Sequence, residues 1–205
     1  MDRIKYPGSA PQANFQETAQ YNIALLGKDL KGSLLDIGAY KGLSKKWLPP
    51  SVEYHGVDVQ DWDMDCIKEV DLNTSKLPYP DATFDYILAA NVIEHLLIPP
   101  ARMVAEIKRV AKQDAIILVS LPNDRGLAKL LYQLMRMFNG VDDLAKQEFN
   151  HHWEFDLETA RSLLLPNFDI LDTKYHPGVY LSKVPIFNRI KRLTSDLYFI
   201  CKNRP

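Results

Sequence analysis

Short apolar runs alternate with helix-like segments between residues 33 and 122, and this alternation is what most constrains the fold. A strand followed by a helix and then another strand forms a βαβ unit, whose right-handed crossover makes neighbouring strands parallel. We therefore expect a mostly parallel sheet with helices on both faces. The apolar runs cover 33–38, 52–59, 67–72, 84–90 and 115–122.

The helix-like segments complete this pattern. Residues 42–48 could form a helix that Pro49-Pro50 ends, and Pro99-Pro100 open another whose apolar residues recur at helical spacing. The run AIILVSLP (115–122) is apolar throughout, which is typical of a central strand covered on both faces. Outside this core we predict a helix over 12–29, one or two within 124–149, others over 156–165 and 184–193, and strands over 168–176 and 196–202.

Composition excludes several classes of protein. The chain has 205 residues, of which 46% are hydrophobic and 25% charged, as expected for a single globular domain. The net charge is −1, so nothing global attracts the protein to nucleic acid or to an anionic membrane. No stretch approaches the roughly 20 apolar residues of a membrane span, and the N-terminal residues lack a signal-peptide pattern. We therefore expect a cytoplasmic protein with two reduced thiols, Cys66 and Cys201.

The stretch LLDIGAYKG (34–42) raises the question of the ligand. An apolar strand that ends at a glycine turn brings backbone close to a nucleotide-like ligand, but the G-x-G-x-x-G and P-loop spacings for phosphate are absent. A nucleoside with an amino-acid tail fits better. Asp58, at the end of the second predicted strand, could accept both ribose hydroxyls; its alternative role is that of a turn residue.

A second stretch extends the argument. Residues 70–112 contain Asp71 after the third predicted strand, then LPYPD (77–81), then Phe84-Asp85 opening the fourth. Together with LLDIGAYKG, this composite resembles the class I S-adenosylmethionine-dependent methyltransferases, particularly the broad type 11 group that acts on small molecules and lipids. The resemblance implies an α/β, Rossmann-like three-layer sandwich with a mostly parallel seven-stranded sheet and an antiparallel last strand.

The resemblance also implies residue roles. Asp36 and Gly38 would shape the loop at the methionine part of S-adenosylmethionine, and Gly42 would open the next helix. Asp58 would hold the ribose and Val59 beside it would belong to the cofactor site, while Asp71 and the Leu72 backbone would hold adenine. Asn91 would lie near the reactive methyl. S-adenosylhomocysteine would be the product.

The chain departs from the family pattern at two points. The family loop usually reads G-x-G-x-G, whereas Tyr40 replaces the central glycine. If this position needs a positive φ, tyrosine is strained there by roughly 1 kcal/mol or more; if it does not, the ring could cover the cofactor. The second departure is KQDA (112–115), which stands where the family commonly has a Gly-Gly turn.

Histidines are the candidate bases, because a neutral imidazole accepts a proton near pH 7. The candidates are His95 in NVIEHL and the adjacent pair His151 and His152, of which at most one should face the substrate. A capping role for His95 and a surface role for the pair are the alternatives. Glu94 could orient a base, although we expect an exposed loop carboxylate. No carboxylate cluster is visible near the site, so we expect no metal.

The substrate side is less defined by sequence. Residues 126–140 and 184–193 are basic amphipathic segments, each of which could belong to the core, cover an apolar substrate or contact lipid. We expect one domain over 1–205, divided into an N-terminal arm and helix (1–32), a cofactor-binding core (33–122), a substrate-side insertion (123–155) and the C-terminal part of the sheet (156–205).

These observations favour methylation of a small-molecule or lipid-like acceptor by in-line displacement. A catalytically silent member of the fold that serves as a binding or scaffold protein is the alternative, motivated by Tyr40. A nicotinamide-dependent oxidoreductase lacks its glycine motif, and no nucleic-acid partner is expected. Peripheral contact with a membrane or lipid stays open, and the sequence leaves the acceptor atom and the oligomeric state undetermined.

Overall fold

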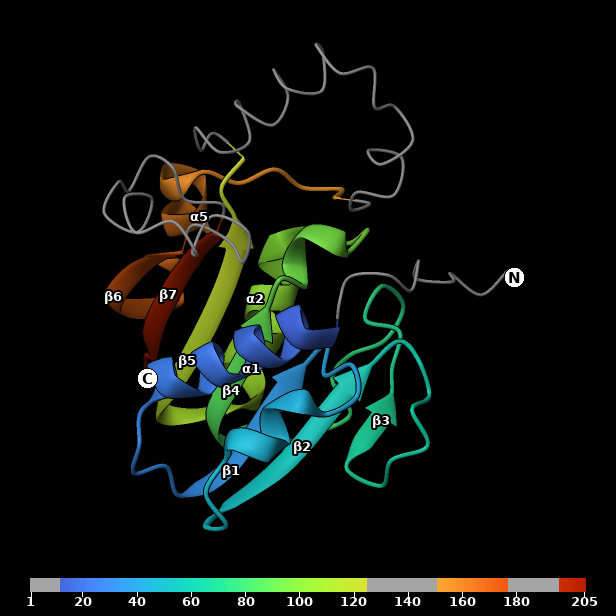
Figure 1. Cartoon of the computed structure of the whole chain (residues 1–205). Coiled ribbons are helices and arrows are strands. Elements are labelled where there is room, and N and C mark those ends of the chain that lie inside the picture. The colour runs from blue at the N-terminus through green and yellow to red at the C-terminus, as the bar shows by residue number, and fades with distance from the viewer. Residues whose placement is uncertain (1–11, 125–150, 177–195) are drawn as a thin grey trace, which may run out of the picture.

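The computed structural model describes residues 12–124, 151–176 and 196–205 (Figure 1). Its helices are α1 (Gln12–Leu26), α2 (Pro100–Val110) and α5 (Leu157–Leu164), with two short 3₁₀ helices, η1 (Leu43–Trp47) and η2 (Ile93–His95). Its strands are β1 (Gly32–Ile37), β2 (Val52–Asp58), β3 (Ile67–Glu69), β4 (Phe84–Ala90), β5 (Ala111–Pro122), β6 (Phe168–His176) and β7 (Asp196–Asn203).

These strands form one sheet in the order β3-β2-β1-β4-β5-β7-β6. The strands from β3 to β5 are mutually parallel, whereas β7 is antiparallel to both β5 and β6. The predicted seven-stranded, mostly parallel sheet with an antiparallel last strand is therefore confirmed. The chain runs outward from β1 to β2 and β3 and then returns to place β4 on the other side of β1. The strand order therefore reverses between β1 and β4.

Helices cover both faces of this sheet, which explains why its central strands are apolar throughout. On one face, α1 packs over Leu34 and Tyr54 through Ile23 and Leu26. On the other face, α2 and α5 pack over strand residues such as Leu35. Figure 1 shows α1 crossing the sheet on the near side. Adjacent residues of β1 thus bury their side chains in different layers, as a strand requires.

The described helices follow from their local sequence. In α2, the buried residues recur at helical spacing behind Pro100, which occupies the first turn. They are Met103, Val104, Ile107 and Val110. In α5, Asp156 and Thr159 form a capping box, in which each side chain accepts a hydrogen bond from the other residue's backbone N–H.

Several boundaries differ from the prediction. Helix α1 ends at Leu26, three residues early, because Gly27 adopts a φ of 123°. The predicted helix at 42–48 is a 3₁₀ helix, and β3 stops at Glu69. Residues 112–115 do not form a turn between elements: β5 already begins at Ala111 and contains an irregularity opposite Phe84–Tyr86, with Asp114 at a φ of 65°.

Some predictions fall where the structure makes no statement. The helices expected within 124–149 and over 184–193 lie, apart from Asp124, outside the described residues. Among the residues that are described, no helix combines the length and the apolar character needed to cross a bilayer. Both cysteines are free, with Cys201 buried and Cys66 half-buried.

Candidate active site

Four predicted cofactor residues lie at the carboxyl ends of four neighbouring strands. Gly38 follows β1, Asp58 ends β2, Asp71 comes two residues after β3, and Asn91 follows β4. These strands are adjacent in the order β3-β2-β1-β4, so their ends lie along one edge of the sheet. In open α/β sheets, ligands bind at this edge, where the strand order reverses. The structure thus brings together residues that are up to 53 positions apart in the sequence.

Gly38, in the loop after β1, lies against Val92 in the loop after β4. Its φ is 72°, and a Cβ atom there would lie 2.5 Å from Cγ2 of Val92. Its amide donates a 2.9 Å hydrogen bond to the Val57 carbonyl. The loop after β1 is therefore held against both β2 and the loop after β4, and only glycine fits between them. Gly42, with a φ of 63°, precedes η1 as predicted for the residue that opens the next helical segment.

Tyr40 adopts a positive φ of 50°, so the strain expected for a non-glycine residue is present. Its ring stacks on Phe15 at 5.3 Å between centroids and meets Trp62 edge-on at 4.8 Å. The Lys41 amine lies 5.5 Å from the centre of the same ring. Aromatic contacts of this kind contribute about 0.5–1.5 kcal/mol each, enough to offset the strain. Tyr40 is thus held by its neighbours in a conformation that glycine adopts easily.

Asp58 connects the loops after β1 and β2. One carboxylate oxygen, Oδ2, accepts from the Tyr40 amide at 2.8 Å, and Oδ1 accepts from the Gln60 amide at 3.0 Å. The bond to Gln60 is the turn contact that the sequence allowed as an alternative. A carboxylate has about four acceptor positions, so two are left for ribose hydroxyls. Asp58 therefore fits the expected cofactor while also fixing the loop, and Val59 beside it is exposed.

Asp36 differs from the other carboxylates because it is buried beneath the loop. It accepts a 2.9 Å hydrogen bond from the Tyr54 hydroxyl and another from Ser44. Burial raises the pKa of Asp36 to about 6; the two hydrogen bonds oppose this, and the charge of Asp58 adds to it. With 4% of its surface exposed, Asp36 can support the loop from below.

Asp71 and Asn91 follow β3 and β4, the two outer strands of the four whose carboxyl ends carry the predicted cofactor residues. Asp71 is exposed, and its Oδ1 accepts from the Asn73 amide at 2.9 Å, while Leu72 is buried. Asn91 adopts a φ of 52°, and its Oδ1 accepts from the Ser120 hydroxyl of β5 at 3.0 Å. The exposed Asp71 carboxylate fits an adenine amino group, and Asn91 is oriented by its neighbouring strand.

The structure separates the three candidate histidines into a pair and a surface residue. His95 ends η2, and its ring meets that of His151 edge-on, with 4.8 Å between centroids. His152 is exposed, and its backbone amide donates to the Glu94 carbonyl at 2.8 Å. The ring of His151 therefore lies beside His95 of the loop that follows Asn91, whereas His152 is exposed. That at most one of the two faces a substrate stays a prediction.

Glu94 corrects the sequence analysis, which predicted an exposed loop carboxylate. Only 1% of its surface is exposed, and its Oε2 has no hydrogen-bond partner among the described residues. Burial raises the pKa of Glu94 to about 8, a backbone hydrogen bond opposes this, and the charges of Asp196 and Asp124 add to it. The apolar neighbours of Glu94 in NVIEHL were the only sequence signal for this burial.

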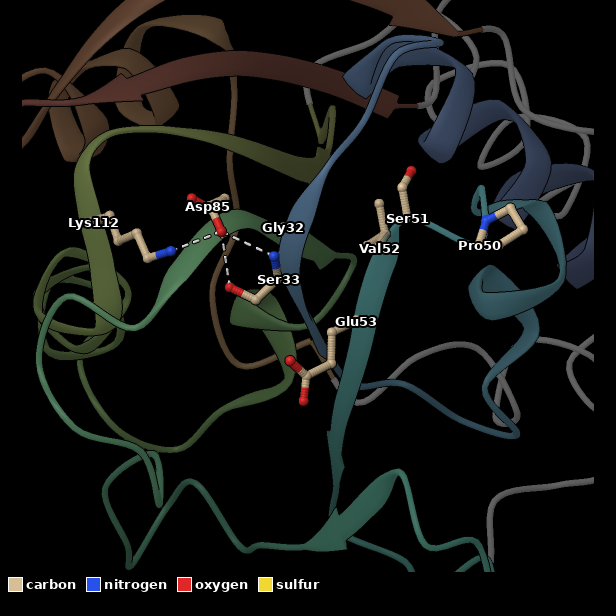
Figure 2. Close-up of a pocket in the computed structure, with 8 residues that line it drawn as sticks. All are labelled: Gly32, Ser33, Pro50, Ser51, Val52, Glu53, Asp85 and Lys112. Carbon is tan, nitrogen blue, oxygen red and sulfur yellow. Dashed lines mark hydrogen bonds and ion pairs between the residues drawn. The ribbon is translucent and has the colours of Figure 1, made fainter.

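A separate pocket lies at the opposite edge of the sheet (Figure 2). There Asp85 accepts hydrogen bonds from the Ser33 amide at 2.9 Å, the Ser33 hydroxyl at 3.0 Å and the Lys112 amine at 2.8 Å. Although partial burial opposes it, these bonds lower the pKa of Asp85. The pocket is at the amino ends of β1, β2 and β4, and its polar groups connect strands to one another. It is therefore separate from the cofactor residues.

Comparison with known families agrees with the geometry of the carboxyl edge. The profile of the methyltransferase-domain family Methyltransf_23 matches residues 12–165. The chain therefore belongs to this family of methyltransferases. S-adenosylmethionine is the cofactor that the family implies, and the class I resemblance seen in the sequence is confirmed.

Solved structures share the fold at low sequence identity. One similar structure is a chain from the Haloferax volcanii complex between the Trm112 methyltransferase activator and a methyltransferase. It has a TM-score of 0.65 and 11% identity over 95% of this chain and 93% of that chain. A methyltransferase dependent on S-adenosylmethionine from Archaeoglobus fulgidus has a TM-score of 0.63 and 17% identity over 97% and 96% of the two chains. One from Mesorhizobium loti has a TM-score of 0.63 and 13% identity over 90% and 98%. No curated protein sequence matches the chain.

Proposed function

We propose that this protein transfers the methyl group of S-adenosylmethionine to a small-molecule or lipid-like acceptor at the carboxyl edge of β1–β4. The observation that carries the proposal is the convergence of Gly38, Asp58, Asp71 and Asn91 on that edge. The cofactor supplies a methyl group made electrophilic by its sulfonium. The chain's own contribution is to bind and orient the reactants, which supplies most of the acceleration available to an in-line displacement.

His95 and His151 are the residues that we propose for the acceptor side. His95 lies on the loop after β4, and the ring of His151, from the segment before α5, packs against it. Val92 of the same loop contacts Gly38 of the cofactor loop. A hydroxyl or amine acceptor becomes a better nucleophile as it loses its proton, and a neutral imidazole can take that proton. His152, which is exposed, is the weakest of the three candidates.

Two basic amphipathic segments of the sequence favour an acceptor class. Residues 126–140 fall within the proposed substrate-side insertion of 123–155 and combine an apolar stripe with basic residues, as do residues 184–193. Such segments suit an apolar acceptor with an anionic group. Peripheral contact with lipid is part of this proposal, whereas the cofactor site does not depend on it.

Binding of S-adenosylhomocysteine, measured by calorimetry, tests the cofactor site. The wild-type protein is compared with Asp58→Asn, which keeps one acceptor oxygen for the loop, and with Asp65→Asn, which neutralises an exposed acid seven residues further along. We expect binding to weaken at least about 10-fold in Asp58→Asn, because a hydrogen bond to a charged group is worth about 1.5–3 kcal/mol. Asp65→Asn should bind like the wild type.

Two results would contradict the proposal. The first is an intact, folded wild-type protein that does not bind S-adenosylhomocysteine. The second is equal weakening in Asp58→Asn and Asp65→Asn, which would indicate a general effect of charge. Binding with the expected pattern would justify a screen of radiolabelled methyl transfer to phenolic, amine and prenylated or acylated acceptors.

A further inference from the structure

Glu94, His95 and His151 bring three potential metal ligands together beside the proposed acceptor position. One ligand atom from each residue lies within 4.8 Å of those from the other two. Glu94 and His95 belong to η2, whereas His151 comes from a segment 56 positions further along the chain. The cluster is therefore a product of the tertiary structure, and it contains two imidazoles and one carboxylate.

The Glu94 carboxylate is the group that indicates a missing ligand. Its side chain is 1% exposed, and Oε2 has no hydrogen-bond partner among the described residues. A buried polar atom without a partner costs about 1–3 kcal/mol, and more when the group is charged. The other oxygen, Oε1, lies 4.0 Å from His95 Nε2, which is beyond hydrogen-bond distance. The carboxylate therefore faces the imidazole without bonding to it.

The spacing of the three ligand atoms suits a cation. A point central to atoms separated by at most 4.8 Å lies within about 2.8 Å of each. Ligand distances to Zn²⁺ are about 2.0–2.2 Å, so each side chain would move inward by roughly 0.7 Å. Rotations about side-chain bonds supply a movement of this size without a change in the backbone.

The backbone around the cluster is well anchored. The amides of His152 and Trp153 donate to the Glu94 carbonyl at 2.8 and 3.3 Å, and Trp153 Nε1 donates to the Leu96 carbonyl at 2.8 Å. These bonds join the segment that carries His151 to η2. The ligand set is thus held by elements that are joined through hydrogen bonds independent of the three ligand side chains, as a metal centre requires.

We propose that Glu94, His95 and His151 bind one divalent transition-metal ion, such as Zn²⁺, with further positions open to solvent or substrate. Two imidazoles and one carboxylate form a donor set that suits Zn²⁺, Fe²⁺, Co²⁺ or Ni²⁺ better than Mg²⁺ or Ca²⁺, which prefer oxygen ligands. Three protein ligands with an open position are characteristic of catalytic centres. The sequence contains no clustered carboxylates near the site and so predicted no metal, whereas this ligand set joins residues that are distant in the chain.

Such a centre would narrow the acceptor class, a consequence that rests on the proposed function. A divalent cation lowers the pKa of a coordinated hydroxyl, which loses its proton to solvent near neutral pH. The resulting acceptor oxygen then forms a bond to the methyl carbon as the carbon–sulfur bond breaks. The acceptor would accordingly be a phenol, a vicinal diol or a similar oxygen nucleophile, and the two histidines would serve as ligands in place of a base.

The test uses the full-length chain, stripped of metal with a chelator. Zn²⁺ is titrated by calorimetry, and Co²⁺ by the visible absorption that reports nitrogen and oxygen ligands. Variants Glu94→Gln and His151→Gln remove one ligand each, while His152→Gln removes the neighbouring exposed histidine as a matched control. Thermal unfolding of each metal-free variant shows whether it is folded. We expect one Zn²⁺ per chain, affinity reduced at least 10-fold in both ligand variants, and no change in His152→Gln.

Three results would overturn the inference: no binding by the wild type, equal binding by wild type and Glu94→Gln, or loss of binding in His152→Gln. S-adenosylhomocysteine is titrated in parallel into the metal-free protein. Cofactor binding without metal binding would reject this inference alone, whereas metal binding without cofactor binding would reject the proposed function alone.

Discussion

The backbone amide of Tyr40 donates a 2.8 Å hydrogen bond to Oδ2 of Asp58, so the loop after β1 is joined to the end of β2. This bond connects the residue that departs from the family glycine pattern with the carboxylate that we propose for the ribose. Tyr40 thus combines a backbone φ of 50° with an amide bonded to Asp58. This hydrogen bond and the ring contacts with Phe15 and Trp62 together hold the residue in its strained conformation.

Replacing Tyr40 should reverse the usual order of stability between alanine and glycine. Both Tyr40→Ala and Tyr40→Gly lose the ring contacts with Phe15 and Trp62. Only alanine keeps the strain of a positive φ, which costs about 1–2 kcal/mol. Urea denaturation should therefore show Tyr40→Gly to be more stable than Tyr40→Ala by about 1 kcal/mol. Alanine as the more stable variant would mean that the backbone here is unstrained.

Gly38→Ala should destabilise the protein by about 2–3 kcal/mol. The new Cβ would lie 2.5 Å from Val92 Cγ2, and the φ of 72° adds strain. The double variant Gly38→Ala/Val92→Ala removes the clash and leaves the strain. Thermal or urea unfolding of the single and double variants should then show coupling of about 1 kcal/mol or more, with Val92→Ala alone as the reference. Simple additivity would indicate that the two loops are not in contact.

Asp36 should make stability depend on pH between about 4 and 6. Burial raises its pKa from an ordinary value of 3.8 to about 6, so the folded state holds its proton where the unfolded state has released it. The contribution of Asp36 to stability is present in full below pH 4 and is lost as the pH rises to 6. The loss amounts to about 3 kcal/mol. Asp36→Asn does not titrate, so its unfolding free energy relative to wild type should rise by up to that amount over this interval.

Urea denaturation at several pH values measures this difference. Asp65→Asn, which removes an exposed acid, serves as the control and should show little dependence on pH relative to wild type. A constant difference between Asp36→Asn and wild type from pH 4 to 7 would show that Asp36 ionises with its ordinary pKa in the folded protein.

Arg109→Lys should destabilise the protein by about 1–2 kcal/mol. The guanidinium of Arg109 donates to the carbonyls of Leu77 and Tyr79 at 3.0 and 2.8 Å, and to the carboxylates of Asp81 and Glu106 at 2.8 Å. A lysine ammonium cannot reproduce this planar set of donors. Arg102→Lys, on the exposed side of the same helix, should be nearly neutral. Equal effects in urea denaturation would show that the contacts to 77–81 contribute no stability.

The contacts of Arg109 also show a structural role for part of the motif on which the family resemblance rested. The LPYPD segment is held by Arg109 of α2 through its carbonyls and Asp81, and the Leu77 amide donates to Glu106. Within the described residues these contacts are structural, since they fix the connection between β3 and β4. A motif can thus identify a family without contributing directly to the binding site.

The strands and their order along the chain could be predicted because each strand is marked by a local run of apolar residues. The run 84–90 matches β4 residue for residue, β2 ends one residue earlier than predicted, and β1 is displaced by one residue at both ends. Glycine turns and strand ends then place Gly38, Asp58, Asp71 and Asn91 at one edge, since parallel strands share the direction of their carboxyl ends. These features depend on residues that are close in the sequence or on a rule of sheet topology.

The sequence by itself therefore determined the layers of the fold, the family and the edge at which the cofactor residues gather. Only the tertiary structure decided that Glu94 is buried, that His151 and not His152 joins His95, and that Tyr40 adopts a positive φ. The physical reason is the same in each case. The environment of these residues is made by segments distant in the chain: 151–153 packs on η2, and Asp58 captures the Tyr40 amide. Periodicity and spacing carry no information about such contacts.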